Sequence, residues 1–328
     1  MNSCQSQAPA GGLKLAFFGS PDLALPSLEA VLHAGHQVVR VYTQPDRPAG
    51  RGRRLLACPV ARRSRELGLC VSQPRRLSDP EVVEEIRALR AQAAVVVAFG
   101  QIFPPPLLAA FPLGCINLHT SLLPLLRGAS PINHAILEGH SRTGVSTMYL
   151  DRGLDTGDVI LQRATPIDPQ ETAGSLAARL AGMGAELLVD TLALVARGQA
   201  PRTPQDHSRA TYAPKLSKAD GLLDWSLAAQ ELDRRVRGLD PWPAAFTFLQ
   251  GRQLRLFAPT AVDPHASLAD PPGSLLPPRL GRDDLMWLAT GSGALGVGRV
   301  QAAGKRQVAA ADFLRGARLA PGTRLGEK

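Results

Sequence analysis

The chain has 328 residues, of which 45% are hydrophobic and 20% charged, which is typical of a globular protein with one large domain or two ordinary ones. No apolar run is long enough for a transmembrane helix, and the N-terminal MNSCQSQAPAGG lacks the charged and apolar regions of a signal peptide. The four cysteines contain no CxxC pair, so neither a disulfide framework nor a cysteine metal site is indicated, and a reducing, cytoplasmic location is expected.

Strand and helix patterns alternate through the first half of the chain. Apolar runs predict strands at 13–19, 36–44, 69–74, 93–100 and 114–119, and helical spacing predicts helices at 20–35, 55–68 and 78–92, the last with Ser78 as its N-cap. A strand pair at 143–151 and 158–167 precedes a long helix at 171–198. This alternation predicts an α/β domain, residues 13–198, with a Rossmann-like, mainly parallel sheet. The preceding residues 1–12 are expected to be a disordered tail.

The character of the sequence changes after residue 198. Residues 199–214 are polar, contain prolines and lack periodicity, which indicates a linker. Beyond the linker, the pattern predicts one helix at 226–239 and two hairpins at 246–259 and 284–301. One helix and several strands within residues 215–328 suit a small OB-like β-barrel domain.

Asn117 and His119 lie where the predicted strand CINLH ends. Ligands of open α/β sheets bind at the carboxyl ends of strands, and the two-residue period places both side chains on one face, roughly 6–7 Å apart. An amide and an imidazole suit a carbonyl group whose oxygen gains negative charge during a reaction. Either residue alone would more often be structural, whereas the pair at a strand end favours a functional site.

Cys115 shares this face, but its position is poor for catalysis. Four residues of strand would place it roughly 13 Å from His119, too far for a direct hydrogen bond, so a buried apolar role is predicted. The chain has no GxGxxG or GxxxxGK[ST] motif, and its seven histidines show no metal-ligand spacing. Dinucleotides, ATP and metals are therefore not indicated.

The loop DRGLDTGDV, residues 151–159, offers a carboxylate at Asp155 between Gly153 and Gly157. Its aspartates do not follow the spacing of an EF-hand calcium loop. Loop aspartates usually serve turns, but a carboxylate that met His119 in space would orient the imidazole and favour its cationic form.

CINLHTSLLP, RGASPI and GLDTGDV, in this order, resemble the formyltransferase family that uses 10-formyltetrahydrofolate. The resemblance implies that Asn117, His119 and Asp155 are catalytic and that no metal takes part. It also implies a folate site formed by one strand end and one turn, with the residues Val97, Phe99, Gly100, Ser121, Leu122, Leu123 and Pro124. The chain departs from the usual family pattern at Thr120, often Gly, and at Leu125-Leu126, where a basic and an aromatic residue are usual.

A basic segment indicates one branch of this family. Residues 43–65 hold seven arginines and one acid, a composition that favours a polyanionic partner. TQPDRPAGRGRRL, residues 43–55, resembles the loop inserted in methionyl-tRNA formyltransferases, and TYAPKLSKADGLLDWS resembles the start of their C-terminal domain. The resemblance implies initiator Met-tRNA as the RNA partner. Its acceptor end would be contacted by Arg47, Arg51, Arg53 and Arg54, of which Arg51 is the most important.

The implied reaction is a direct transfer in a monomeric enzyme that does not associate with membranes. The methionyl amine attacks the formyl carbon, Asn117 and protonated His119 stabilise the oxygen of the tetrahedral intermediate, and Asp155 helps to remove the amine proton. Two alternatives stay open. A formyltransferase acting on a small amine such as a sugar nucleotide leaves the arginines unexplained. An RNA-binding module whose first domain only holds folate leaves the three polar residues unexplained.

Overall fold

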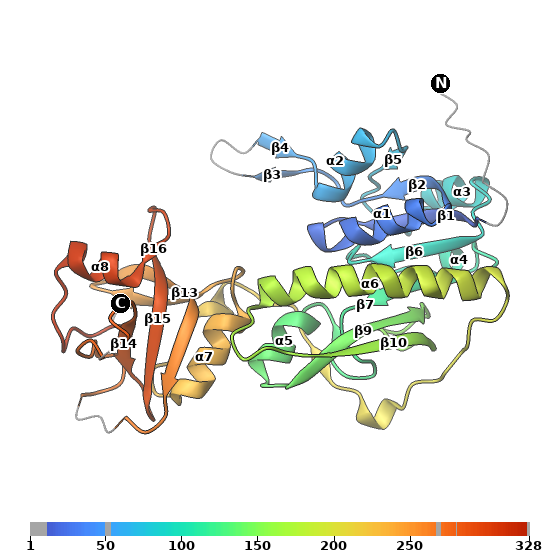
Figure 1. Ribbon diagram of the computed structural model, residues 1–328. Helices are drawn as coiled ribbons and strands as arrows, with labels where there is room; N and C mark the ends of the chain where they lie inside the picture. Colours follow the sequence, from blue (N-terminus) through green and yellow to red (C-terminus); the bar gives the residue numbers. More distant parts are fainter. Residues whose placement is uncertain (1–11, 50–53, 267–269, 280, 327–328) are drawn as a thin grey trace. The chain divides into compact units, whose positions relative to one another are not determined.

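The computed structural model describes residues 12–49, 54–266, 270–279 and 281–326, with only the backbone for 47–49 and 54 (Figure 1). The chain forms two compact units. The first comprises residues up to 131 together with 143–165 and 177–213, and the second comprises 132–142, 166–176 and the residues from 214 onward. The second unit therefore includes two short segments from earlier in the sequence than its main part.

A seven-stranded sheet forms the centre of the first unit, with the strand order β10-β9-β7-β6-β1-β2-β5. Neighbours from β7 to β5 pair in parallel, and β9 is antiparallel to β7, so the predicted mainly parallel sheet is confirmed. From β1 the chain first builds outward through β2 and β5 and then reverses to β6 on the other side. The strands are β1 (Lys14–Gly19), β2 (Gln37–Tyr42), β5 (Val71–Ser72), β6 (Ala93–Val97), β7 (Cys115–His119), β9 (Arg142–Tyr149) and β10 (Val159–Pro166).

Continuous apolar strands explain why this sheet is buried on both faces. All residues of β6 and β7 are buried. An aromatic cluster centred on Phe18 fills one face, where its ring stacks on Tyr42 at 4.6 Å and meets Phe103 edge-on at 4.9 Å. Burial raises the pKa of Tyr42, whose hydroxyl donates to Glu85. The other face packs against α6 (Ala173–Ala196), where the Thr147 and Thr191 hydroxyls lie 2.7 Å apart.

The remaining helices of the first unit are η1 (Asp22–Ala24), α1 (Leu25–His33), α2 (Pro59–Glu66), α3 (Pro80–Ala88), α4 (Pro105–Leu108) and η2 (His207–Arg209). Two sequence-based boundaries were wrong. The helix predicted from residue 55 begins at Pro59, because 54–56 form strand β4 (Arg54–Leu56), which pairs with β3 (Arg47–Ala49). The N-cap of α3 is Asp79 instead of Ser78, since Pro80, which lacks an N–H, suits the first helical position.

The second unit contains a five-stranded antiparallel sheet with helices. The two predicted hairpins are confirmed: Gln250 and Gly251, both at positive φ, join β12 to β13, and β14 pairs with β15. The Asn133 side chain donates to the Gly238 carbonyl, which joins the segment 132–142 to the helix that ends at Gly238 within this unit. Its elements are α5 (Pro131–Leu137), η3 (Ala219–Gly221), α7 (Ala229–Gly238), β12 (Ala245–Leu249), β13 (Arg252–Asp263), β14 (Met286–Ala289), β15 (Ala294–Ala302), β16 (Val308–Ala309) and α8 (Ala310–Ala317).

Alanine substitutions at two glycines of α6 are expected to have opposite effects on stability. An added Cβ at Gly182 meets nothing within 4 Å, so Gly182→Ala should raise the free energy of unfolding by about 0.5–1 kcal/mol through lower backbone entropy in the unfolded chain. An added Cβ at Gly184 would lie 2.7 Å from Leu118, so Gly184→Ala should lower it by about 1–3 kcal/mol. Urea unfolding of both variants tests the packing of α6 on β7, and equal effects would contradict it.

Candidate active site

Strand β7 carries Asn117 and His119 to the carboxyl edge of the sheet, between parallel β6 and antiparallel β9. Both side chains are buried, with 8% and 6% of their surface exposed. The Asn117 amide makes no hydrogen bond to any residue that the structure describes. A buried amide without a protein partner is able to bind a ligand oxygen at little cost in reorganisation.

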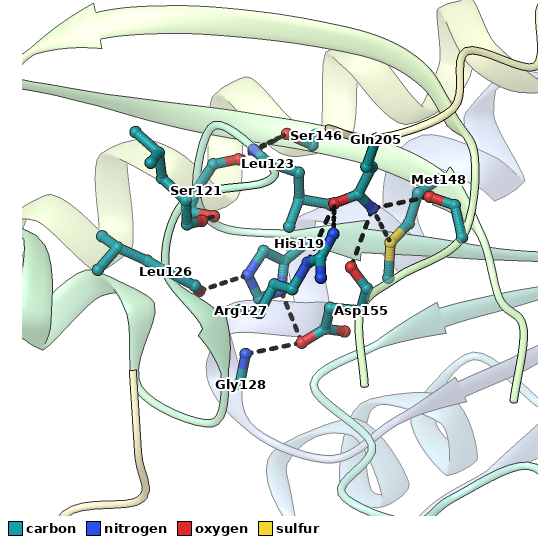
Figure 2. A network of polar contacts seen from close by, with 12 residues as sticks. His119, Ser121, Leu123, Leu126, Arg127, Gly128, Ser146, Met148, Asp155 and Gln205 are labelled. Carbon is teal, nitrogen blue, oxygen red and sulfur yellow. Dashed lines mark hydrogen bonds and ion pairs between the residues drawn. The ribbon is translucent and has the colours of Figure 1, made fainter. Parts of the chain in front are cut away.

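The imidazole of His119 lies between a backbone carbonyl and a carboxylate (Figure 2). Its Nε2 is 3.0 Å from the Leu126 oxygen, and because a carbonyl only accepts, Nε2 carries a proton. Its Nδ1 lies 3.8 Å from Oδ2 of Asp155, which is too long for a direct hydrogen bond but within the distance of an ion pair. The structure thus brings the predicted His119 and Asp155 together.

The Asp155 loop is held by backbone groups and glycines. Asp155 has φ +54°, a left-handed conformation that is uncommon for a residue with a side chain, and its Oδ2 accepts a 2.8 Å hydrogen bond from the Gly128 N–H. Gly157 is required by a close approach, because an added Cβ would lie 1.8 Å from the Tyr149 carbonyl oxygen. Asp151, by contrast, accepts from the Gly153 N–H and therefore serves the turn.

Leu126 contacts His119 through its backbone carbonyl, so the departure of its side chain from the usual family residue does not affect this hydrogen bond. Its carbonyl faces His119, and its N–H donates to Oγ1 of Thr211 at 2.8 Å. Leu126 has φ +56°, which turns its carbonyl away from the regular path of the chain. Both residues that face the imidazole, Leu126 and Asp155, therefore have left-handed backbones.

Arg127 and Gln205 are buried polar residues that the sequence analysis missed as part of this site. Arg127 is 1% exposed, and its Nε and Nη2 donate to Oε1 of Gln205 at 3.1 and 2.7 Å. Gln205 in turn donates to the carbonyls of Asp155 and Gly157. The sequence contained a signal for Arg127, because this residue belongs to the RGASPI motif. It contained none for Gln205, which lies in a segment whose composition resembles a linker.

The segment that holds Gln205 packs on residues 127–130 within the first unit. Strand β11 (Tyr212–Ala213) pairs in parallel with β8 (Arg127–Gly128), and the Arg127 N–H donates to the Thr211 carbonyl at 2.8 Å. Residues 199–213 of the predicted linker therefore belong to the first unit.

The predicted folate residues form two groups at the same edge of the sheet. Val97 ends β6, and the turn after it has positive φ at Ala98 and Gly100, both of which are exposed. The Phe99 ring points into the core, 5.4 Å from the Phe18 ring, so only backbone is offered there. This turn follows the strand next to β1, where the sheet reverses direction, and such a switch point is the usual ligand crevice of an open α/β sheet.

The second group is the turn from Ser121 to Pro124, which is rigidly held. Oγ of Ser121 donates to the Leu125 carbonyl at 2.6 Å. The Leu123 N–H donates to Oγ of Ser146 at 3.2 Å, and the Leu123 side chain is 5% exposed. Leu122 and Pro124 are half-buried and so can present apolar surface to a ligand.

The basic segment is divided between a hairpin and a helix. Arg47 and Arg54 lie on the paired strands β3 and β4, while Arg51 and Arg53 lie outside the described residues. The other three arginines of the segment belong to α2, where Nε of Arg63 pairs with Glu29 at 2.8 Å. The charge is therefore not confined to one loop.

Cys115 is buried, and burial raises the pKa of its thiol to about 12. A thiol that stays protonated is a poor nucleophile. If the protein is the formyltransferase that its motifs resemble, Cys115→Ala should therefore keep near wild-type turnover, measured as the initial rate of formyl transfer. Loss of activity together with a trapped formyl-thioester would contradict direct transfer.

A cavity of about 260 Å³ lies against the Asp155 loop, lined by residues that include Tyr149, Asp158, Arg202 and His207. None of the predicted folate residues lines it. Within the described ranges, no group of three or more His, Cys, Asp or Glu is arranged to hold a metal ion. No helix there has the length and hydropathy needed to cross a bilayer.

Residues 13–192 match the formyl transferase family, and residues 215–318 match the formyl transferase C-terminal domain. A methionyl-tRNA formyltransferase of Solibacter usitatus is 47% identical over 315 residues, covering 96% of this chain and 99% of that protein. One of Geobacter sulfurreducens is 45% identical over 316 residues, covering 96% and 98%. The chain belongs to the methionyl-tRNA formyltransferase family.

Solved structures of other proteins have the same fold. An N-formyltransferase from Helicobacter canadensis, in complex with folinic acid and dTDP-3-aminofucose, matches 87% of this chain and 98% of its own with a TM-score of 0.65 at 16% identity. HypX from Aquifex aeolicus, in complex with tetrahydrofolic acid, matches 92% of this chain and 47% of its own with a TM-score of 0.62 at 18% identity. At these identities the methionyl-tRNA formyltransferase family shares the fold with both proteins.

Proposed function

We propose that the protein transfers the formyl group of 10-formyltetrahydrofolate to the amino group of initiator methionyl-tRNA. The observation that carries this proposal is the meeting of Asp155 and His119 beside the unpartnered Asn117 amide, in a chain of this family. We also propose that the enzyme acts as a monomer in the cytoplasm, where translation is initiated.

In the proposed mechanism, Asn117 and His119 bind the formyl oxygen from the edge of the sheet. With Nε2–H held by the Leu126 carbonyl, a second proton on Nδ1 makes the imidazole cationic, and Asp155 stabilises that cation. Attack of the methionyl amine forms the new C–N bond and moves an electron pair to the formyl oxygen, where the amide and imidazolium donors stabilise it.

Collapse of the intermediate breaks the bond from the formyl carbon to the folate nitrogen. Asp155, directly or through water, removes the proton of the attacking amine, and a proton passes to the departing folate nitrogen. The balance is one C–N bond formed, one C–N bond broken and one proton moved, with no oxidant or metal. We propose that the backbone of the turn at 98–100 and the turn formed by residues 121–124 hold the folate.

One labelled-formyl assay separates the candidate acceptors. Purified enzyme is given 10-formyltetrahydrofolate labelled in the formyl group, with Met-tRNA, with an amino-sugar nucleotide or with no acceptor. The proposal expects label in N-formylmethionine released from the tRNA and none in the sugar. Label in the sugar alone would establish the small-amine alternative, and folate binding without transfer would establish the binding-module alternative.

The arginines of the β3–β4 hairpin region, Arg47, Arg51, Arg53 and Arg54, are the proposed contacts to the acceptor end of the tRNA. Arg51→Ala should weaken the use of Met-tRNA and leave the KM for folate unchanged. Each lost phosphate contact should reduce the slope of log affinity against log salt by about 0.7–0.9. Arg51→Lys should rescue only in part, because lysine lacks the planar two-pronged donor.

Arg62→Ala is the matched control, since it removes the same charge from the exposed surface of α2. Steady-state kinetics at several salt concentrations give the comparison. If Arg51→Ala and Arg62→Ala behave alike, the hairpin has no special role in binding tRNA.

A further inference from the structure

We infer that Gln205 is a positioning residue for catalysis, which holds the Asp155 loop at its working distance from His119. The inference rests on the proposed function and adds to it a residue from outside the recognised motifs. It starts from an uncommon arrangement: a buried guanidinium whose partners are a neutral amide and a neutral imidazole.

Every hydrogen-bonding group of the Gln205 side chain is engaged. Its Nε2 donates to the Asp155 carbonyl at 2.9 Å and to the Gly157 carbonyl at 2.7 Å. Its Oε1 accepts from Nε and Nη2 of Arg127 at 3.1 and 2.7 Å (Figure 2). A glutamine amide has two N–H donors and one oxygen with two lone pairs, so no group is left for another role.

Arg127 determines which way this amide points. A guanidinium only donates, so the oxygen of Gln205 must face Arg127, and the NH₂ group must then face the loop. The remaining partner of the guanidinium is Nδ1 of His207, at 3.2 Å from both Nη1 and Nη2. This nitrogen must accept as well, so the proton of the neutral His207 ring is on Nε2.

The Asp155 loop needs such a restraint. Asp155 has a left-handed backbone, which costs free energy, and the adjacent Leu154 is 59% exposed, so the loop gains little from apolar burial. The two Gln205 hydrogen bonds hold the carbonyls on either side of Thr156.

The same short segment that holds Gln205 also holds both members of the catalytic pair. Residues 126–128 supply the Leu126 carbonyl to His119, the Arg127 guanidinium to Gln205 and the Gly128 N–H to Asp155. The spacing between His119 and Asp155 is therefore set by one segment, which contacts both side chains directly and holds the Asp155 backbone through Gln205.

The test uses two substitutions of similar size in the full-length chain. Gln205→Met removes all polar contacts. Gln205→Glu keeps the acceptor for Arg127, which becomes an ion pair, and removes the donor to the two loop carbonyls. Single-turnover rates, the KM for folate and for Met-tRNA, and the melting temperature are measured for each variant.

If Gln205 positions the Asp155 loop, the melting temperature and the transfer rate of the Gln205 variants should not change in parallel. Gln205→Met should lower both the melting temperature and the transfer rate. Gln205→Glu should recover the melting temperature relative to Gln205→Met, yet its transfer rate should stay about 10- to 100-fold below wild type with KM values unchanged. Ser208→Ala is the matched control, because this exposed residue of the same segment contacts only Asp206 in the described residues and should behave as wild type.

A transfer rate that follows the melting temperature across both variants would show that Gln205 is merely structural and would overturn the inference. A Gln205→Glu rate equal to wild type would overturn it as well. Failure of the proposed function looks different, because wild type itself would then transfer no formyl group to Met-tRNA.

Discussion

Asn117→Ala, His119→Ala and Asp155→Ala are each expected to slow formyl transfer by about 10²–10³-fold. In the proposed mechanism, Asn117 and His119 supply the donors for an oxygen that becomes charged only in the transition state, and Asp155, 3.8 Å from the imidazole, stabilises its cationic form. Loss of these groups should therefore lower the single-turnover rate and leave the affinity for Met-tRNA near normal.

Asp158→Asn provides the matched control, since it neutralises a second carboxylate of the same loop that pairs with Arg202 at 3.8 Å and does not contact His119. Single-turnover kinetics and tRNA filter binding give the two readouts. A slow Asp158→Asn variant with an unaffected Asp155→Ala variant would show that the wrong carboxylate has been assigned.

Gly157→Ala is the second change for which a large effect is expected. The added Cβ would lie 1.8 Å from the Tyr149 carbonyl oxygen, so the end of β9 or the Asp155 loop must move. A displacement of about 1 Å at a catalytic group can lower a rate by about 10²-fold. Far-ultraviolet circular dichroism should remain native, because the clash is confined to the loop and the last residue of β9.

Gly153→Ala in the same loop is its control. The added Cβ there would lie 1.9 Å from Oγ1 of Thr156, a side-chain atom that can rotate away at the cost of its hydrogen bond to Asp151. Its effect on the transfer rate should be much smaller. Equal rates for the two variants would contradict the requirement for a close backbone approach at Gly157.

The sheet and the two C-terminal hairpins could be predicted because their signals are local. A continuous apolar run such as 93–97 indicates a strand buried on both faces, and Gln250-Gly251 between strand patterns indicates a tight turn. The β3–β4 hairpin was missed because arginines, prolines and glycines in that segment conceal any strand pattern. For the same reason, the helix predicted to begin at residue 55 begins at Pro59 in the structure.

The strand end with Asn117 and His119 was predictable, but its surroundings were not. Period 2 placed Asn117 and His119 on one face, whereas the contact of His119 with Asp155 joins residues 36 apart in the chain and depends on how strands pair. Gln205 lies 78 residues from Arg127, in a polar segment whose composition indicates a linker. A local pattern cannot show that such a segment packs on an active-site turn.

One single-turnover experiment tests the central claim that the formyl group passes directly from folate to Met-tRNA at His119. Enzyme in excess is mixed with labelled 10-formyltetrahydrofolate and Met-tRNA, and the label is counted in folate, protein and tRNA over time. Direct transfer at His119 predicts that the label lost from folate equals the label gained in N-formylmethionyl-tRNA at every time, and that the protein never holds label. His119→Ala should slow the loss and the gain together. Label that appears first on the protein, or never reaches the tRNA, would contradict direct transfer.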